Sequence, residues 1–293
     1  MTATVGAPVV AGARWDPPAA IAVRGTLLIL PGRGEHAGVY DRFGRRLAVD
    51  GYAVRSVAPA TAAAAVGEAV APVVLVGSDE GALHALRLAA TLAVDGAIVA
   101  GTPWSGAAPP SARTAPELRS VDRPNSSGLV GRPTEGSSLS SVGRPTEDGL
   151  GLVGRPTETG DPGRLRTGGW DAELEARSAC PTHQARLTGD TGFRRGALTE
   201  PLPAGLRESV DPGAVAVPVL VVHGEADPVT PVDAARALAA ALPQAELATV
   251  RAGRHDALND ITHRTVAAHV VLWLERLRAD RAVTPILTVT RPA

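Results

Sequence analysis

The apolar positions of the chain form short runs that alternate with segments of helical spacing. Two runs, 26–30 and 73–76, are apolar almost throughout and end at turn residues, as expected for strands buried on both faces of a parallel sheet. The same reasoning predicts strands at 26–30, 52–58, 73–76, 96–100, 217–222 and 245–250. It predicts helices at 35–49, 62–71, 82–93 and 234–242, and a last helix from Asn259 or Asp260 to about Ala279. Strands that alternate with helices indicate an α/β fold with a mostly parallel sheet and helices on both faces.

This alternation stops after Trp104. From about 105 to 168 the chain is rich in Gly, Pro, Ser, Thr and Arg. The unit Val-Gly-Arg-Pro-Thr-Glu occurs there at 130–135, 142–147 and 153–158. These units lack the apolar residues that stacked repeats bury, so we interpret the segment as a disordered insertion. A binding role for the repeats is the alternative.

The pattern therefore divides the chain into two halves of one core, separated by an insertion. After the insertion the chain regains helical character, which we interpret as a small cap. The predicted parts are the first half of the core at 1–104, the low-complexity insertion at 105–168, the helical cap at 169–210, the second half of the core at 211–279 and a tail at 280–293.

Composition narrows the function classes. The 293 residues are 44% hydrophobic, which allows a sizeable core, and the formal net charge of −1 argues against a dedicated nucleic-acid-binding protein. The sequence contains no lysine, so all 29 residues counted as Lys or Arg are arginine. Mechanisms that need a lysine, such as Schiff bases and the Walker phosphate site, are excluded.

The single cysteine, Cys180, has no partner for an internal disulfide, as in proteins of a reducing compartment. The first 18 residues have no basic segment followed by a long apolar stretch, and no apolar run is long enough to span a membrane. We therefore expect a cytoplasmic protein without a membrane span. No recognised spacing of metal ligands occurs, so we expect neither a metal nor a cofactor.

Candidate chemistry lies in the turns that follow the strands, because ligands of parallel sheets bind beyond the carboxyl ends of the strands. The turn at 77–81 reads Gly-Ser-Asp-Glu-Gly between a strand and a helix, which is the layout of a nucleophile elbow with Asp79 at its centre. An ordinary strand-to-helix turn with an acidic residue near the helix start is the alternative.

Four turns, in the order in which they occur along the chain, resemble those of a known family. Besides 77–81, they are Gly32-Arg33-Gly34-Glu35-His36 followed by Tyr40, the segment 218–227 that ends in His-Gly-Glu-Ala-Asp, and Ala-Gly-Arg-His-Asp at 252–256. Over about 21–104 and 211–279 the sequence resembles the α/β-hydrolase superfamily. It is most similar to the monoacylglycerol lipase/lysophospholipase branch, which is serine aminopeptidase-like. The resemblance implies the α/β-hydrolase fold with a cap inserted in the sheet, and a small or lipid-like ester as substrate.

Residue by residue, the resemblance implies a triad in which Asp79 is the nucleophile, Asp227 the acid and His255 the base. A carboxylate nucleophile would attack a carbon electrophile and form an ester, which water activated by His255 would hydrolyse. The backbone N–H groups of Arg33 and Glu80 would form the oxyanion hole. Trp104, after the fourth predicted strand, is a candidate for substrate binding.

The sequence also departs from this branch. Serine is absent from the nucleophile position, because Ser78 precedes it by one residue, and the Asp-Arg-Gly-His-Gly segment of the branch is replaced at 56–60. One alternative is therefore a non-hydrolytic, ligand-binding member of the fold. Another is an epoxide hydrolase or haloalkane dehalogenase, which use an aspartate nucleophile. Those relatives have Trp where this chain has Glu80, and the epoxide hydrolases use cap tyrosines, whereas both tyrosines here, Tyr40 and Tyr52, lie outside the predicted cap.

Overall fold

The computed structural model describes residues 12–106, 164–165 and 168–287. The three hexapeptide repeats and almost all of the predicted insertion lie outside the described residues. The last residues of the predicted tail, 288–293, lie outside them too. The fold below is therefore that of the two core halves and of the helical segment that precedes the second half.

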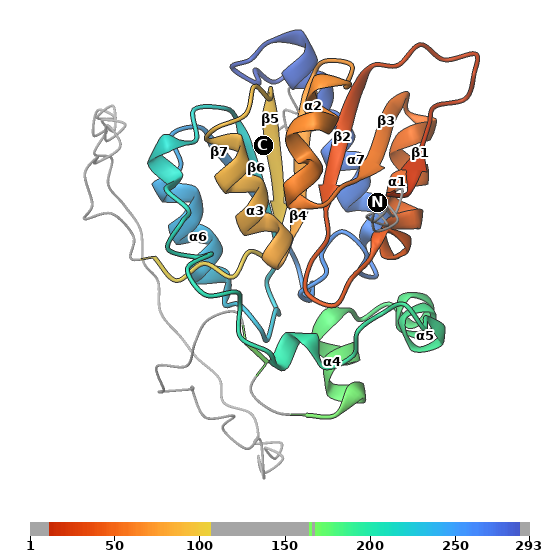
Figure 1. Ribbon diagram of the computed structural model, residues 1–293, viewed down its shortest axis with the longest axis vertical. Coiled ribbons are helices and arrows are strands. Elements are labelled where there is room, and N and C mark those ends of the chain that lie inside the picture. The colour runs from red at the N-terminus through yellow and green to blue at the C-terminus, as the bar shows by residue number, and fades with distance from the viewer. Residues whose placement is uncertain (1–11, 107–163, 166–167, 288–293) are drawn as a thin grey trace, which may run out of the picture. The chain divides into compact units, whose positions relative to one another are not determined.

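A seven-stranded sheet forms the centre of the fold, with the order β1-β3-β2-β4-β5-β6-β7 (Figure 1). All neighbouring strands are parallel except β1, which pairs with β3 in the antiparallel direction. The strands are β1 Arg14–Trp15, β2 Gly25–Leu30, β3 Tyr52–Ser56, β4 Val73–Ser78, β5 Gly96–Ala100, β6 Val219–Gly224 and β7 Ala245–Val250. All six predicted strands are present, and the mostly parallel sheet is confirmed.

Helices cover both faces of the sheet, as predicted (Figure 1). The α-helices are α1 Asp41–Val49, α2 Ala62–Gly67, α3 Glu80–Ala89, α4 Trp170–Arg177, α5 Pro181–Gly189, α6 Val232–Ala241 and α7 His263–Ala279. Short 3₁₀ helices occur at Ala37–Tyr40, Pro59–Thr61, Ala197–Thr199 and Pro212–Ala214. Helices α1 and α7 pack on one face, and α2, α3 and α6 pack on the other.

Alternation along the strands produces two apolar cores. Leu27 and Ile29 of β2 contribute to the core beneath α1 and α7, whereas Leu28 and Leu30 contribute to the core beneath α3 and α6. All six residues of β2 are buried, because the strand is covered on both faces. This two-sided burial explains why the strands appear in the sequence as continuous apolar runs.

Several element boundaries differ from the prediction. Helix α3 begins at Glu80, two residues earlier than expected, and follows Asp79 directly. Helix α7 begins at His263, so Asn259 and Asp260 are not its N-caps. The Asp260 carboxylate instead accepts the backbone N–H groups of Ala179 and Arg254, and is thereby used to hold two loops together. Strand β1 was not predicted, because two residues are too few to show the alternation of apolar and polar residues that is typical of a strand.

The helices α4 and α5 lie at the carboxyl ends of the parallel strands (Figure 1). The chain that contains α4 and α5 continues past Arg194. A backbone hydrogen bond joins it to the loop after β2, since the Arg194 N–H donates to the Gly34 carbonyl at 2.9 Å. A Cβ atom at Gly34 would come within 2.4 Å of the Arg194 carbonyl oxygen, so the approach requires glycine. The segment therefore covers the edge of the sheet where ligands of parallel sheets bind.

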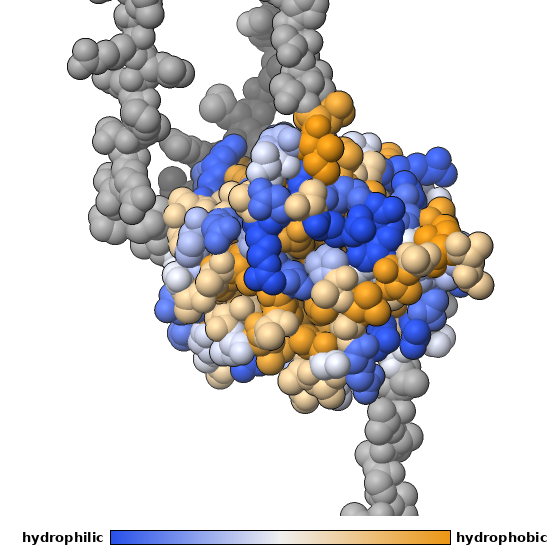
Figure 2. All heavy atoms as spheres, turned by 90° about the horizontal axis from the view of Figure 1, so that it is seen from above, coloured by the Kyte–Doolittle hydropathy of each residue, from blue (hydrophilic) through white to orange (hydrophobic). Residues whose placement is uncertain are grey.

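The end of the described structure opposite α4 and α5 carries the amino ends of the parallel strands (Figure 1). Seen from that end, hydrophilic and hydrophobic residues are interspersed over the surface (Figure 2). Among the helices of the described residues, none combines the length and apolar character needed to cross a lipid bilayer.

Candidate active site

The turn between β4 and α3 has a strained backbone. Asp79 adopts φ 50° and ψ −120°, a conformation that residues other than glycine rarely adopt. Its two flanking glycines are required by close approaches, since a Cβ at Gly77 would lie 2.2 Å from the Gly81 carbonyl oxygen and one at Gly81 would lie 1.9 Å from that of Leu30. This is the geometry of a nucleophile elbow rather than of an ordinary strand-to-helix turn.

The structure brings Asp79, Asp227 and His255 together, although they lie far apart in the sequence. The Nδ1 atom of His255 is 2.8 Å from Asp227 Oδ2, and its Nε2 atom is 3.3 Å from Asp79 Oδ1. All three side chains are fully buried. The histidine therefore bridges the carboxylate of the elbow and a second carboxylate, which is the arrangement of a catalytic triad.

Asp227 is held by the turn after β6. Its Oδ1 atom accepts the backbone N–H groups of Val229 at 2.8 Å and Thr230 at 3.1 Å, which leaves Oδ2 for His255. His223, the next-to-last residue of β6, lies 3.4 Å from Asp227 Oδ2 and contacts the Thr230 carbonyl at 2.9 Å. Burial lowers the pKa of His223, so its imidazole is neutral at pH 7. Sequence analysis did not single out His223, although it belongs to the His-Gly-Glu-Ala-Asp turn.

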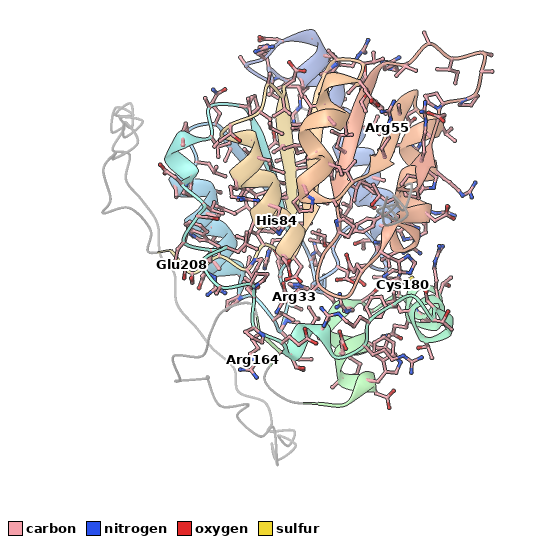
Figure 3. The ribbon with its side chains drawn as sticks, in the orientation of Figure 1. Arg33, Arg55, His84, Arg164, Cys180 and Glu208 are labelled. Atoms are coloured by element: carbon pink, nitrogen blue, oxygen red, sulfur yellow. The ribbon has the colours of Figure 1, made fainter. Side chains whose placement is uncertain are left out.

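Arg33 contacts Asp79 through both its backbone and its side chain. Its backbone N–H donates to Asp79 Oδ2 at 3.1 Å, and its oxyanion-hole role stays a prediction. Its guanidinium also donates from Nε to Oδ2 at 2.7 Å and from Nη2 to Oδ1 at 2.8 Å. Only 2% of the Arg33 side chain and none of the Asp79 side chain are exposed. Arg33 lies at the end of the sheet that faces α4 (Figure 3).

The second predicted oxyanion donor behaves differently. Among the described residues, the hydrogen bonds to the Asp79 carboxylate come from Arg33, and none comes from the Glu80 N–H. His255 Nε2 lies 3.3 Å from Oδ1 as a charge contact. The Glu80 carboxylate lies 3.6 Å from His84 Nε2, one turn further along α3. The Glu80 carboxylate is therefore close to an imidazole of the same helix. The oxyanion role of Glu80 stays a prediction.

The site contains four ionisable groups in contact with one another, and their pKa values depend on these contacts. Burial by itself would raise the pKa of Asp79, but Arg33 and His255 hold it well below its usual range. Burial would likewise lower the pKa of His255, but the carboxylates of Asp227 and Asp79 raise it to about 10. At neutral pH the site therefore contains two carboxylates, one guanidinium and one imidazolium. The two carboxylates thus favour the protonated form of the His255 imidazole.

The pKa of His255 predicts a loss of stability at alkaline pH. Because this pKa is about 10 in the folded protein, above the ordinary 6.5, folding favours the protonated imidazole. The stabilisation is complete below about pH 6.5 and is lost as the pH rises toward 10. Urea unfolding of the wild type from pH 6 to 10 should show this loss, and His255→Gln should lack it. A His84→Gln control should keep it, and equal pH profiles for wild type and His255→Gln would contradict the prediction.

A buried charge network supports the loop that carries Arg33. Glu35 Oε2 accepts the backbone N–H of Gly32 at 2.9 Å and the hydroxyl of Tyr40, and thereby closes the loop after β2. Arg177, the last residue of α4, donates from Nη2 to the Arg33 carbonyl at 2.7 Å. Helix α4 therefore fixes the backbone whose N–H points at Asp79.

Arg177 itself is fully buried and surrounded by carboxylates. It contacts Glu173 at 3.0 Å, Glu35 at 3.3 Å and Asp256 at 3.5 Å, and its guanidinium lies 4.8 Å from the centre of the Phe193 ring. Burial would lower the pKa of Arg177, but these carboxylates raise it, so the group stays charged. Nothing in the sequence pattern singles out Arg177, because its partners lie in three separate segments.

The remaining candidates lie apart from the triad. Ser78 is buried within β4 and interacts with the Tyr40 hydroxyl, so it does not take the nucleophile position. Trp104 is buried in the apolar core that lies beneath α3 and α6. Its predicted substrate contact stays a prediction. In the described residues, no group of three or more His, Cys, Asp and Glu side chains is arranged to hold a metal ion.

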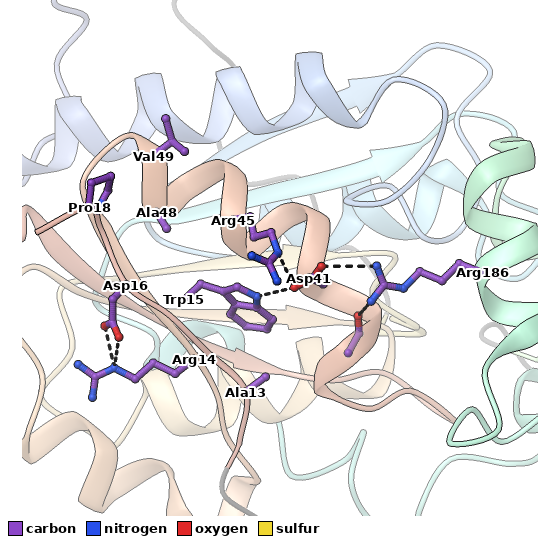
Figure 4. Close-up of a pocket in the computed structure, with 11 residues that line it drawn as sticks. Ala13, Arg14, Trp15, Asp16, Pro18, Asp41, Arg45, Ala48, Val49 and Arg186 are labelled. Atoms are coloured by element: carbon purple, nitrogen blue, oxygen red, sulfur yellow. Dashed lines mark hydrogen bonds and ion pairs between the residues drawn. The ribbon is translucent and has the colours of Figure 1, made fainter.

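A cavity of about 750 Å³ lies beside β1 and α1, away from the elbow (Figure 4). Asp41 anchors its wall, since it accepts the Trp15 Nε1–H at 2.9 Å and the Arg45 Nε–H at 2.9 Å. Neither Asp79 nor His255 lines this cavity, so it does not belong to the candidate active site.

Solved structures similar to this chain include hydrolases of lipids. The monoacylglycerol lipase of Paleococcus ferrophilus is 15% identical, with a TM-score of 0.56 over 92% of this chain and 98% of the other. A soluble variant of monoglyceride lipase from Saccharomyces cerevisiae is 14% identical, with a TM-score of 0.58 over 91% of each chain. MenH from S. aureus is 12% identical, with a TM-score of 0.51 over 92% of this chain and all of the other. At such identities the likeness shows the fold alone.

A family model, Abhydrolase_4, described as TAP-like protein, matches residues 199–285, which is less than half of the chain. The matched part includes Asp227 and His255 but not the elbow, which lies before it in the sequence. No curated protein matches the chain. The sheet order, the elbow after β4 and the similar solved structures agree, and the chain has the α/β-hydrolase fold.

Proposed function

We propose that this protein is a hydrolase that acts on a small or lipid-like ester through a covalent intermediate on Asp79. The proposal rests on the different contacts that the two carboxylate oxygens of Asp79 make. Oδ2 accepts the backbone N–H of Arg33, whereas Oδ1 faces Nε2 of His255 at 3.3 Å. An aspartate nucleophile needs this arrangement, with one oxygen in the oxyanion hole and the other toward the substrate.

The first step uses His255 as an acid. A lone pair of Asp79 Oδ1 attacks the acyl carbon of the ester, and the bond from that carbon to the leaving oxygen breaks. The leaving oxygen takes the proton from Nε2 of His255, which the raised pKa keeps in place at neutral pH. The products are the free alcohol, a neutral imidazole and a mixed anhydride between Asp79 and the acyl group.

The second step regenerates the carboxylate. With the charge of Asp79 lost, His255 retains only Asp227 as an anionic partner, so its affinity for a proton falls and it can act as a base. Nε2 takes a proton from water, and the hydroxide adds to Cγ of Asp79. The charge that develops on Oδ2 is stabilised by the Arg33 N–H. The bond from Cγ to Oδ1 then breaks, and the acyl group leaves as a carboxylate that takes the proton of the new hydroxyl group on Cγ, so that Asp79 is again a carboxylate. The net reaction consumes one ester and one water.

The similar structures support an ester as the substrate. Two of them are named as a monoacylglycerol lipase and a monoglyceride lipase. A carboxylate is a weaker nucleophile than a serine alkoxide, so esters with weakly basic leaving groups are the best first probes. We therefore choose 4-nitrophenyl butyrate as the test substrate.

Isotope transfer from water tests the covalent step. With enzyme in excess over 4-nitrophenyl butyrate in oxygen-18 water, a single turnover should place oxygen-18 in the Asp79 carboxylate, because water attacks Cγ. Cleavage after arginine gives a peptide of residues 56–87 that contains Asp79, and fragmentation separates it from Glu68 and Glu80. The His255→Gln variant should instead accumulate the acyl adduct on the same peptide.

The control for this experiment is Glu80→Gln, which changes the neighbouring carboxylate and should leave the label on Asp79. Hydrolysis of the ester without label or adduct on Asp79 would contradict the proposed mechanism, because it would mean that water or another group attacks the substrate directly.

A second candidate function is a ligand-binding protein without hydrolytic activity. The observation that favours it is the bidentate, fully buried ion pair of Arg33 and Asp79, which occupies both oxygens of the carboxylate. Absence of turnover on a broad panel of esters, together with retained binding of small ligands, would favour this candidate over the hydrolase.

The epoxide hydrolase and dehalogenase alternatives gain no support from the tyrosines. The Tyr40 hydroxyl donates to Glu35, and the Tyr52 hydroxyl donates to Glu275 at 2.5 Å. Neither hydroxyl is directed at Asp79. Styrene oxide and short haloalkanes remain useful members of the panel.

A further inference from the structure

The last residue of α4, Arg177, contacts both loops that face the carboxylate of Asp79. One loop follows β2 and contains Arg33, and the other follows β7 and contains His255. The Arg33 N–H and the His255 imidazole contact different oxygens of Asp79. We infer, resting on the proposed function, that Arg177 is a positioning residue that sets the distance between these two groups across Asp79.

Backbone hydrogen bonds join the end of α4 to the loop of His255. The Ala176 carbonyl accepts the N–H of His255 at 3.1 Å, and the Arg177 carbonyl accepts the N–H of Asp256 at 2.8 Å. Both carbonyls belong to the last turn of α4, where a helix supplies no N–H donors of its own. The helix end and the histidine loop are therefore joined through the peptide backbone.

The Arg177 side chain joins the same helix end to the loop of Arg33. Nη2 donates to the Arg33 carbonyl at 2.7 Å, and Nη1 lies 3.3 Å from Glu35 Oε1. Nη1 also lies 3.5 Å from Oδ1 of Asp256, the residue that follows His255. The nitrogens of one rigid, planar group therefore span the two loops. Loss of this group should let the loops move relative to each other.

In the proposed mechanism, Asp79 reacts only while its two oxygens keep their different contacts. Oδ2 accepts the Arg33 N–H at 3.1 Å, and Oδ1 lies 3.3 Å from His255 Nε2. Catalysis depends steeply on such distances, since a displacement of about 1 Å can lower the rate about 100-fold. Arg177 is suited to fix them, because its side chain is fully buried and surrounded by carboxylates.

The pKa of the His255 imidazole tests the inference without reference to activity. Burial would lower this pKa, but the carboxylates of Asp227 and Asp79 raise it to about 10. In Arg177→Met the loop of His255 should withdraw from Asp79, so the pKa should fall and the proton affinity should decrease at least about tenfold. A nitrogen-15 NMR titration of the imidazoles measures the pKa, and the spectrum of His255→Gln assigns the signal.

The loss of charge alone predicts the opposite sign. Removal of a nearby cation makes an imidazole easier to protonate, so the missing guanidinium by itself would raise the pKa of His255. The Asp256 carboxylate, which would lose its contact with Arg177, acts in the same direction through its attraction to His255. A fall therefore reports a displacement of the loop. An equal or higher pKa in Arg177→Met would overturn the inference.

Turnover provides a second measurement. In Arg177→Met, kcat for 4-nitrophenyl butyrate should fall about 100-fold, as for a displacement of about 1 Å, while KM changes less than about threefold. The matched control is Arg195→Met, which removes an exposed guanidinium of the same segment. It should keep the pKa of His255 and leave kcat within about twofold of the wild type.

Arg177→Lys separates positioning from a merely structural role. The ammonium group keeps the positive charge but is a single point, so it cannot span both loops as a guanidinium does. It should recover most of the urea midpoint that Arg177→Met loses, yet leave kcat at least about tenfold below the wild type. Recovery of kcat together with stability would overturn the inference. If Arg177→Met does not fold, Arg177→Lys serves for both measurements.

The inference and the proposed function can fail independently. If Asp79 takes up oxygen-18 but the pKa of His255 does not fall in Arg177→Met, the inference is wrong and the mechanism stands. If no label reaches Asp79 but the pKa falls in Arg177→Met and not in Arg195→Met, Arg177 holds the geometry of the site and the hydrolase proposal is wrong.

Discussion

Asp79→Asn is expected to lower kcat for 4-nitrophenyl butyrate by about 10⁴-fold or more, which is the scale of loss when a covalent nucleophile is removed. The amide keeps the shape of the side chain and the strained backbone of the elbow but lacks the charge that attacks the acyl carbon. Stopped-flow or steady-state release of 4-nitrophenolate measures the effect, and circular dichroism shows that the variant is folded.

Ser78→Ala is the informative control for this prediction. Ser78 is the hydroxyl adjacent to the elbow, yet it lies within β4 and interacts with Tyr40. Its removal should change kcat by less than about threefold, as for substitutions that leave the reacting groups in place. The reverse result, with Ser78→Ala inactive and Asp79→Asn active, would place the nucleophile one residue earlier and refute the assignment.

Arg177→Met is expected to destabilise the protein by about 3–5 kcal/mol, because removal of one partner leaves buried carboxylates without compensation. The side chain is fully buried, so little of its interaction is screened by water. Methionine fills a similar volume and isolates the effect of the charge. Urea unfolding at pH 7 measures the change in the free energy of unfolding.

Arg195→Met provides a closely matched control. The guanidinium of Arg195 lies 4.8 Å from the centre of the Trp170 ring, the same distance that separates Arg177 from the Phe193 ring. Arg195 is exposed, however, and contacts no buried carboxylate. Its replacement should cost less than about 1 kcal/mol. Similar losses for both variants would show that stacking on the ring, rather than the buried charge network, stabilises this region.

The sequence predicted those parts of the fold that depend on local pattern. Strands buried on both faces must be apolar at every position, so β2 and β4 were visible as uninterrupted runs. The elbow was visible because its close backbone approaches require glycine at 77 and 81. The triad roles of Asp79, Asp227 and His255 came from the family resemblance of the turns after three strands, and they stay a prediction. The two-residue β1 left no period to detect.

The charge partners of the site could not be predicted in the same way. A guanidinium reaches its partner through a long flexible side chain, so the pairing of Arg33 with Asp79 depends on the relative positions of two loops. The same holds for Arg177, whose carboxylates come from the loop after β2, from α4 and from the turn after β7. Asp260 was misassigned as a helix cap for a related reason, since its carboxylate serves distant loop amides.

The buried pair of Arg33 and Asp79 also constrains how this chain can change over generations. A single substitution that placed serine at position 79 would remove the carboxylate that the buried Arg33 guanidinium contacts. A single substitution of Arg33 would leave the carboxylate with His255 as its remaining cationic contact among the described residues. Replacement of Asp79 is therefore unfavourable while Arg33 is present, and replacement of Arg33 is unfavourable while Asp79 is present. We expect the two residues to be replaced together. Such reciprocal dependence hinders a stepwise change of the elbow residue to serine.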